Sequence, residues 1–474
     1  MLTDLFKGLQ PPSQHNTFGS LRQGSAPRRS LPMTESSQSG LLQGLTVSRW
    51  KSRASVKWIV LVAIIASGLV WLRFVQHATA SSVIQSLRPG TMTKPEGFKI
   101  IGLLFYGRRS TIEILECYLR KNLVSHGGYL DEIHFVINTH NEEDLGWLSE
   151  MVKQVEDYKW VDISDGVIQD FNRIYNETIE YDHMYVKLDD DLVWMSPNAV
   201  PTLVHTLMDH PEAFAVIAAL INSATLGWVQ YRLGAVHSYL PEPEPPFQPN
   251  KDAYGPKAWR ASALPTYKLE IGGKVEDFPN TEKSGAAEHA PVGSIGAAPY
   301  ANHRWLPLRD ESLLPETPIA HTEYLPDGQG WKRWAIGAQQ HYSLLENLEN
   351  DQLHKYYIGE DGIWNMRYDR TNVNLLAIWG NDILDNLPFE GADDEQLISV
   401  ELPRKHRRRK QRLTTQLSNR LLTMPSENLV QTHALTAHFS FAVQPEMYDT
   451  DLLSRYRAYA NEMVCSSNNQ IPIR

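Results

Sequence analysis

Short apolar runs alternate with segments of helical periodicity between Phe98 and Ile221. The apolar runs are 98–106, 132–138, 160–164, 184–188 and 214–221. Helices are expected between them, at 110–126 with Ser110 or Thr111 as the cap, at 141–158, at 167–179, and from Ser196-Pro197 onward. Strands that alternate with helices form a mainly parallel sheet flanked by helices, because each parallel connection needs a crossover. The expected fold class is therefore α/β.

The run 184–188 ends in three consecutive carboxylates, Asp189, Asp190 and Asp191. Asp is unfavourable in strands and costly to bury without a partner. In extended backbone Asp189 and Asp191 would point the same way, whereas Asp190 would face the other side and bond to the backbone. Such a pair of carboxylates suits Mn²⁺ or Mg²⁺, with phosphate oxygens completing the shell. A turn or helix-capping cluster is the alternative.

Other polar residues follow the ends of the predicted strands, where ligands bind in parallel sheets. They are Arg108, Arg109, Asn138, Thr139 and Asp165. Arg108, Arg109 and Lys187 are candidates for contacts with phosphate, and Tyr106 is a candidate for stacking on a base. For each of these residues, core packing or a surface ion pair is the competing explanation.

The second half of the chain is less regular. Residues 240–320 form a Pro/Gly-rich insertion, expected to be an extended surface segment. Regular structure is expected again as helices at 331–347 and 451–463 and as strands at 373–379 and 438–443. The basic run 404–412 is interpreted as a solvated loop.

The segment 58–72 is uncharged and almost wholly apolar, with Lys57 before it and Arg73 after it. It predicts a single transmembrane helix at 57–75, a buried core helix being the alternative. Residues 1–57 carry eight Lys or Arg against two acidic residues, so this side is expected to be cytoplasmic. Residues 1–56 are then a disordered tail, 76–97 a stem, and the remainder lies in the lumen as a type II membrane protein.

Composition bears on the partners and on the covalent modifications of the chain. The 474 residues carry a formal net charge of -10, which argues against a nucleic-acid partner. The two cysteines, Cys117 and Cys465, can pair or stay free, and Asn176-Glu-Thr178 is a glycosylation sequon whose use the sequence leaves open.

Leu188-Asp-Asp-Asp-Leu192 resembles the GT-A fold glycosyltransferases, in which an apolar strand ends in Asp-x-Asp. The lumenal part is also similar to a group of uncharacterised fungal glycosyltransferase-like proteins. That similarity is carried by Trp364, Tyr368-Asp-Arg370, Asp393-Asp-Glu395 and His438-Phe-Ser-Phe441. The resemblance implies a GT-A-like fold in which 98–239 binds the nucleotide-sugar and 321–474 forms the acceptor side.

The resemblance also implies a set of site residues. Mn²⁺ (or Mg²⁺) would be held by Asp189, Asp191 and His438, with His438 beginning a strand and His433 as a rival ligand. Asp189 would alternatively touch the nucleotide ribose. Asp393 or Asp394 would act as the general base of an inverting enzyme, whereas a retaining enzyme needs no such base and a helix N-cap is the competing role.

The resulting expectation is a metal-dependent glycosyltransferase, of hexosyltransferase type, in the Golgi or endoplasmic reticulum membrane. It would use a nucleotide-sugar donor and a glycan, glycolipid or glycoprotein acceptor. One alternative is a membrane-tethered pseudoenzyme that binds glycans or organises other transferases. The other is a different metal-dependent group transferase or a phosphodiester hydrolase with the same carboxylates.

Overall fold

The computed structural model describes residues 92–163, 172–242, 257–268, 300–326, 328, 333–389, 393–405, 427–439 and 444–472. All of them belong to the unit Thr79–Arg474. The predicted tail and transmembrane helix lie outside these ranges, as does most of the basic run 404–412, and all three stay predictions. Within the described ranges, no helix combines the length and apolar character needed to cross a bilayer.

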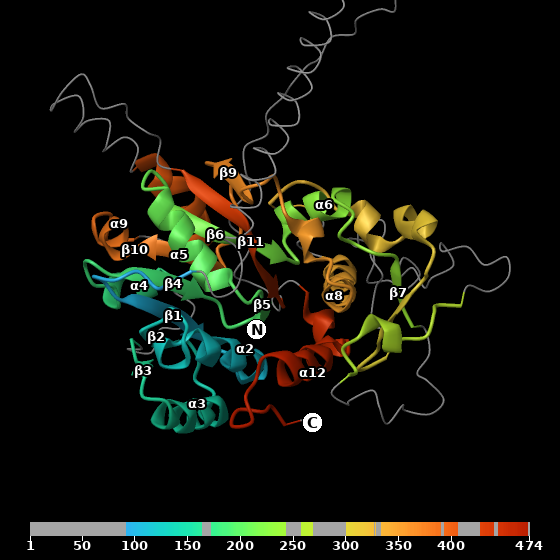
Figure 1. Ribbon diagram of the computed structural model, residues 1–474, viewed down its shortest axis with the longest axis horizontal. Coiled ribbons are helices and arrows are strands. Elements are labelled where there is room, and N and C mark those ends of the chain that lie inside the picture. The colour runs from blue at the N-terminus through green and yellow to red at the C-terminus, as the bar shows by residue number, and fades with distance from the viewer. Residues whose placement is uncertain are drawn as a thin grey trace, which may run out of the picture. The chain divides into compact units, whose positions relative to one another are not determined.

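A nine-stranded sheet forms the centre of the unit (Figure 1), in the order β3-β2-β1-β4-β10-β6-β11-β5, with β9 also beside β11. All five strands predicted in the first half are present: β1 (Ile100–Tyr106), β2 (Glu132–Ile137), β3 (Tyr158–Val161), β4 (Met184–Leu188) and β6 (Ala215–Ile221). The ladders β1–β2, β1–β4 and β2–β3 are parallel, as expected. The mixed α/β class is therefore confirmed.

The second half of the chain completes the same sheet. The predicted strand β10 (Leu375–Trp379) lies between β4 and β6 and is antiparallel to both. Strand β11 (Asn428–His438) lies between β6 and β5 (Leu192–Met195), parallel to the former and antiparallel to the latter. Strand β9 (Ile363–Arg367) adds an antiparallel partner to β11. The two predicted parts, 98–239 and 321–474, thus contribute strands to one sheet.

The predicted strand start at His438 is wrong, because β11 ends at His438 and Phe439 is not part of a strand. Residues 440–443 of this predicted strand lie outside the described residues. Strand β11 extends backward through Leu435 and Val430 to Asn428. Its polar residues obscure the pattern in the sequence, yet Asn428, Gln431 and Thr436 are buried and hydrogen-bonded. Buried polar groups of this kind need partners that only the tertiary structure supplies.

The predicted helices are present in the predicted order with shifted ends, whereas α6 and α9 were not predicted and α10 matches only the helix N-cap alternative at Asp393. The described helices are α2 (Arg109–Asn122), α3 (Glu142–Gln154), α4 (Arg173–Glu177), α5 (Ala199–Asp209), α6 (Ala224–Arg232), α8 (Trp334–Glu349), α9 (Gly380–Leu384), α10 (Asp394–Gln396) and α12 (Leu452–Met463). The Asn141 side chain caps α3 by accepting from the N–H groups of Glu143 and Asp144. The predicted cap of α2 at Ser110 or Thr111 is wrong, because the helix already begins at Arg109.

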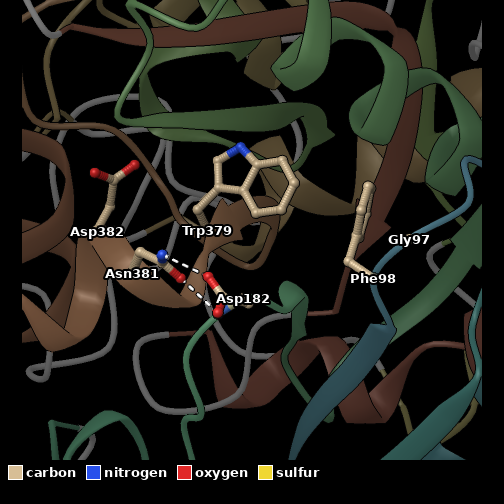
Figure 2. A pocket seen from close by; sticks show the side chains of 6 residues that line it. All are labelled: Gly97, Phe98, Asp182, Trp379, Asn381 and Asp382. Atoms are coloured by element: carbon tan, nitrogen blue, oxygen red, sulfur yellow. Dashed lines mark hydrogen bonds between the residues drawn. The ribbon is translucent and has the colours of Figure 1, made fainter.

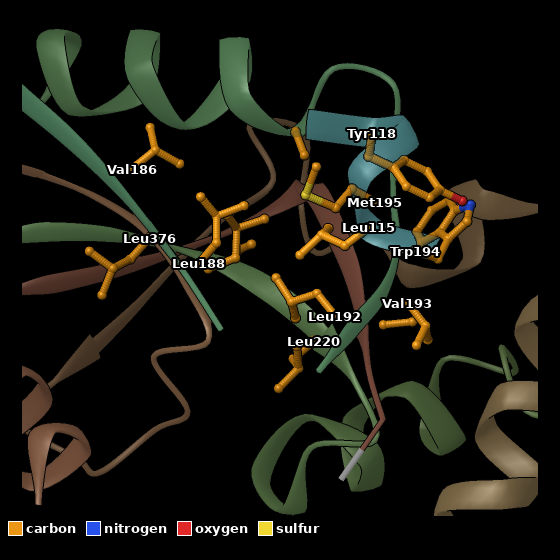
Figure 3. Close-up of a cluster of buried hydrophobic side chains, with 14 of the residues drawn as sticks. Leu115, Tyr118, Val186, Leu188, Leu192, Val193, Trp194, Met195, Leu220 and Leu376 are labelled. Atoms are coloured by element: carbon orange, nitrogen blue, oxygen red, sulfur yellow. The ribbon is translucent and has the colours of Figure 1, made fainter. Parts of the chain in front are cut away.

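The apolar core fixes the strands on either side of the carboxylate triplet. Every residue of β4 and of β5 is buried. Figure 3 shows Leu115 and Tyr118 of α2 beside Leu192 and Trp194 of β5. Two strands anchored in this way leave the short segment between them little freedom.

A disulfide between Cys117 of α2 and Cys465, just beyond α12, resolves the question of pairing that the sequence left open. It ties the first helix of the unit to the end of the chain. The insertion is closed at its base by β7 (Tyr239–Pro241), which pairs antiparallel with β8 (Trp305–Pro307).

Candidate functional site

The carboxylate triplet forms a tight turn between β4 and β5, at the carboxyl edge of the parallel strands. Its backbone is pinned on both sides. The Asp189 N–H donates to the Asn374 carbonyl at 2.9 Å, and the Asp191 carbonyl accepts from the Phe439 N–H at 2.7 Å. The first bond comes from the segment before β10 and the second from the end of β11. The turn therefore holds the three carboxylates at the junction of three strands.

Two of the carboxylates converge on Arg108. The Asp190 carboxylate accepts from the Gly107 N–H at 2.8 Å and pairs with the Arg108 guanidinium. Arg108 Nη2 is also 3.2 Å from Asp191 Oδ2. The backbone bond expected of Asp190 is thus present, but Asp190 and Asp191 share one cation and do not face opposite ways. The reason is the turn, which replaces the extended backbone assumed for the triplet.

His438 meets Asp191 from the end of β11, with Nε2 at 3.0 Å from Asp191 Oδ2. Both side chains are almost wholly enclosed. Burial by itself would raise the pKa of Asp191, but His438 and Arg108 more than offset it and hold that pKa at about 2. Burial would lower the pKa of His438, and the Asp191 charge reverses this, so the pKa of His438 is raised. The arrangement favours an ionised Asp191.

Asp189 belongs to a second cluster, built around the buried Lys187. Lys187 Nζ lies 2.6 Å from Asp189 Oδ1 and 3.1 Å from Asp394 Oδ2. The Asn374 amide donates to Asp189 Oδ2 at 2.7 Å. Burial, together with the charges of Asp191 and Asp394, raises the pKa of Asp189 to about 7, although Lys187 opposes the rise. Lys187 thus links the triplet to the acidic motif 393–395, which is some 200 residues away in sequence.

The structure therefore gathers six of the nine residues predicted for the site. Lys187, Asp189 and Asp394 form one cluster, and Arg108, Asp191 and His438 form the other. The rival His433 packs against Tyr357 instead, with ring centroids 4.4 Å apart. Asp165 lies outside the described residues.

Three predicted site residues have other positions. Tyr106 has no exposed surface, and its hydroxyl donates to the Asp144 carbonyl at 2.8 Å, so its ring is part of the core. Arg109 pairs with Glu113 at 2.7 Å and with Glu143 at 3.4 Å. Asp393 caps α10 through the Gln396 N–H at 2.9 Å and pairs with Arg370 at 2.6 Å. The N-cap role thus accounts for Asp393, although not for Asp394.

Two residues that hold His438 were not predicted from the sequence. The His438 carbonyl accepts from Asn222 Nδ2 at 3.1 Å and lies 3.2 Å from His341 Nε2. His341 is fully buried in α8, and its Nδ1 lies 2.6 Å from the Tyr456 hydroxyl. Asn222 directly follows the predicted strand 214–221, so the rule that ligand-side residues follow strand ends already pointed to it. Nothing in the sequence pattern singles out His341.

The donor atoms near Asp191 fit a divalent cation in part. Asp191 Oδ1 is buried and has no hydrogen-bond partner, and the imidazole of His438 is adjacent. One or two protein ligands suffice for Mg²⁺ or Mn²⁺ when substrate phosphates and water complete the shell. Among the described residues, however, no three metal-ligating side chains stand together as a preformed site. Asp191 and His438 are thus the residues that would hold the cation, and Asp189 is turned toward Lys187.

A separate cavity of about 430 Å³ lies at the opposite edge of the sheet (Figure 2). It is lined by Gly97, Phe98, Asp182, Trp379, Asn381 and Asp382. Asp182 precedes β4 and Trp379 ends the antiparallel β10, so β4 separates this cavity from the triplet. It contributes no residue to the clusters described above.

Comparisons with known proteins are limited. No family model matches the chain, and no curated protein matches it in sequence. Among solved structures, it is similar to a mannosyltransferase from Pyrobaculum calidifontis in complex with GDP-Man and Mn²⁺, at 14% identity over 34% of this chain and 46% of that chain, with a TM-score of 0.22.

It is also similar to glucosyl-3-phosphoglycerate synthase from Mycobacterium tuberculosis, at 17% identity over 30% and 51% of the two chains, with a TM-score of 0.22. A third similar structure is the 4-diphosphocytidyl-2C-methyl-D-erythritol synthase from Anaerococcus prevotii, at 15% identity over 26% and 56%, with a TM-score of 0.21. The chain matches about half the length of each of these structures. At these TM-scores the likenesses assign neither a family nor a function.

Proposed function

We propose that the protein is a metal-dependent glycosyltransferase that moves a sugar from a nucleotide-sugar to a glycan, glycolipid or glycoprotein acceptor. The observation that carries the proposal is the contact between Asp191 and His438 at the carboxyl edge of the sheet. It joins the end of β4 to the end of β11, which lie almost 250 residues apart in sequence. A buried carboxylate with an open oxygen beside an imidazole is suited to a cation that carries a diphosphate.

Each residue of the site has a task in this proposal. Asp191 and His438 would hold Mn²⁺ or Mg²⁺, which when bound neutralises the nucleoside diphosphate leaving group. Arg108 places a second positive charge beside them and can donate to phosphate oxygens. Lys187 keeps Asp189 in place, so that Asp189 can accept a hydrogen bond from a ribose hydroxyl with its exposed part.

Asp394 is the better of the two candidates for the general base of an inverting reaction. Its partner Asp393 is committed to the cap of α10 and to Arg370, whereas Asp394 faces Lys187 in the cluster that contains Asp189. A carboxylate in that position could take the proton of an acceptor hydroxyl. In a retaining reaction Asp394 would only orient Lys187.

The disulfide supports a location in the secretory pathway. Disulfides persist in oxidising compartments and are rare in the cytosol. Both cysteines of the chain are used in the Cys117–Cys465 bond. Together with the predicted helix at 57–75, this supports a type II protein of the Golgi or endoplasmic reticulum with a lumenal catalytic unit.

One observation favours a non-catalytic alternative. Arg108 bridges Asp190 and Asp191, and Lys187 pairs with Asp189, so each carboxylate of the triplet already has an internal cation. Such pairing allows the triplet to be stable without a metal. The alternative is a pseudoenzyme that binds nucleotide or glycan without turnover.

One experiment separates the two functions. The purified full chain is offered a panel of nucleotide-sugars with and without Mn²⁺, and both nucleotide binding and release of the nucleoside diphosphate are measured. The same panel is run with Asp191→Asn and, as a matched control, with Asp209→Asn, an exposed carboxylate at the end of α5.

Metal-dependent release that is lost in Asp191→Asn and kept in Asp209→Asn supports the transferase. Binding without release supports the pseudoenzyme. If no nucleotide-sugar binds to any variant, the transferase and a nucleotide-binding pseudoenzyme are both refuted.

A further inference from the structure

Arg333 is a buried arginine without a partner among the described residues. It is 6% exposed, and its Nε and Nη1 atoms are enclosed and make no hydrogen bond. Buried guanidinium groups are usually paired, because an unpaired buried charge is costly. Arg455 illustrates the usual case, since it is equally buried and its guanidinium binds both oxygens of Asp451. Arg333 Nε and Nη1 are thus donors for a group that the described residues do not supply.

Arg333 also stands at the N-terminus of a long helix. It occupies the N-cap position of α8, a helix of 16 residues that has no side-chain cap and no acidic residue in its first turn. The Arg333 carbonyl accepts from Gln444 Nε2 at 3.3 Å, which fixes its backbone. The N-terminal end of a helix attracts anions through its N–H groups and its dipole. The unpaired guanidinium and the uncapped helix end therefore favour the same kind of ligand.

Two titratable residues of the described ranges interact electrostatically with Arg333, namely Glu323 and His321. The Glu323 charge stabilises the Arg333 cation, and the Arg333 charge disfavours protonation of His321. Neither residue supplies a hydrogen-bond acceptor to the enclosed Arg333 Nε or Nη1. Glu323 is exposed, so it is a competitor for an incoming anion and not a fixed partner.

This end of α8 faces the candidate site. Gly337, in the first turn of α8, lies directly against the Asn222 side chain. Asn222 in turn donates to the His438 carbonyl. Because β6 and β11 both end here, the N-terminus of α8 is on the edge of the sheet that carries Asp191 and His438.

We propose that Arg333 and the N-terminus of α8 form an anion subsite that binds a phosphate group of the acceptor. The assignment to the acceptor rests on the proposed function. The diphosphate of the donor already has Arg108 and the Asp191–His438 pair. Arg333 belongs to the part 321–474 and is connected to Asn222 through Gln444, which bonds to both residues. An acceptor with a phosphate, such as a phosphorylated glycan or a lipid-linked phosphate, has the oxyanion geometry that a guanidinium recognises.

The test uses the full chain with inorganic phosphate as the probe, followed by thermal unfolding and by titration. Phosphate is expected to raise the unfolding temperature of the wild type, because a ligand of the native state stabilises it. In Arg333→Gln the phosphate dissociation constant is expected to rise by about tenfold or more, since a charge-assisted contact is removed. Glu323→Gln is expected to bind phosphate more tightly, because the competing carboxylate is gone.

A second comparison separates a ligand site from a structural role. Without phosphate, Arg333→Gln is expected to unfold at the wild-type temperature or above it, whereas Arg455→Gln is expected to unfold at a clearly lower temperature. An unchanged response to phosphate in Arg333→Gln refutes the subsite. A fall in unfolding temperature as large as that of Arg455→Gln refutes it as well, because Arg333 is then structural.

Titration with UDP and Mn²⁺ identifies the source of the anion. An affinity for UDP that Arg333→Gln leaves unchanged supports the acceptor. A weaker affinity for UDP overturns the assignment to the acceptor and gives the subsite to the donor. The phosphate measurement does not depend on nucleotide binding, so it still tests the anion subsite if the proposed function proves wrong.

Discussion

Replacing Gly337 by alanine tests the contact that holds His438 in place. A Cβ atom at this position would stand 2.6 Å from Asn222 Oδ1 and 2.9 Å from its Cγ, against 3.4 Å for ordinary contact. Asn222 would have to move by roughly 0.8 Å. It has little freedom to do so, because it is buried, has a φ of 65°, and donates to the His438 carbonyl and to Gln444 Oε1 at 2.8 Å.

The size of the effect follows from three contributions. Overpacking costs about 1–3 kcal/mol. A buried acceptor left without its donor costs about 1–3 kcal/mol. Alanine is favoured over glycine within a helix by about 1 kcal/mol. The expected result is a net destabilisation of about 3 kcal/mol in the free energy of unfolding.

The chain offers a matched control in Gly146→Ala. Gly146 lies inside α3, and a Cβ atom there has nothing within 4 Å. The same substitution should therefore stabilise the protein by about 1 kcal/mol. Urea unfolding of the full chain, followed by tryptophan fluorescence and compared at equal m-values, measures both changes.

The reasoning is refuted if Gly337→Ala and Gly146→Ala change stability in the same direction. A double-mutant cycle locates the cause. In an Asn222→Gly background, which keeps the positive φ available, Gly337→Ala should cost much less, because the obstructing amide is absent. An equal cost in both backgrounds would show that Asn222 is not the residue that must move.

Three further predictions concern buried charges and the disulfide. Lys187→Met leaves two carboxylates unpaired and should lower the free energy of unfolding by about 3–5 kcal/mol, whereas Lys159→Met at an exposed position should leave it nearly unchanged. Burial lowers the pKa of His341 to about 3, so between pH 6.5 and 3 this imidazole takes up its proton in the unfolded chain and not in the folded one. Stability should therefore fall as the pH drops through this window, by at most about 1.4 kcal/mol per pH unit, and His341→Gln should flatten the curve. Paired replacement of Cys117 and Cys465 by serine should lower stability by about 5 kcal/mol and abolish the effect of a reductant on the unfolding midpoint, and an unchanged midpoint would contradict the bond.

The sequence predicts elements whose apolar residues are continuous and fails where burial is mixed with polar groups. β4 was predicted with its observed ends because every residue but Lys187 is apolar or aromatic. β11 was missed over most of its length, because Asn428, Gln431 and Thr436 break the apolar pattern and bond to residues of distant elements. β5 was missed because it follows the triplet at once and pairs with β11.

The same distinction applies to the site. The triplet is identified from residue type and position, because carboxylates at a strand end are informative by themselves. His438 is identified only through the resemblance to the GT-A glycosyltransferases, because a single histidine in the sequence carries no such signal. The pairing of Lys187 with Asp394 is not predictable from the sequence, because a lysine in a strand gives no indication of which distant residue it pairs with. Tyr106 and Asp393 were assigned to the site because sequence cannot distinguish a core tyrosine or a helix cap from a ligand contact.

The position of β11 has a consequence for biosynthesis. This strand is made of residues 428–438, yet it lies between β5 and β6, which leave the ribosome more than 200 residues earlier. Among the described strands, β5 pairs only with β11 and therefore has no strand partner until β11 is made, whereas β6 keeps one edge unpaired even after β10 is made. Cys117 likewise remains without Cys465 until the end of synthesis. Such long-range pairing slows folding and exposes strand edges to aggregation. We therefore expect a nascent chain that stops before β11 to remain bound to chaperones, so that translation has to be almost complete before the protein can be released.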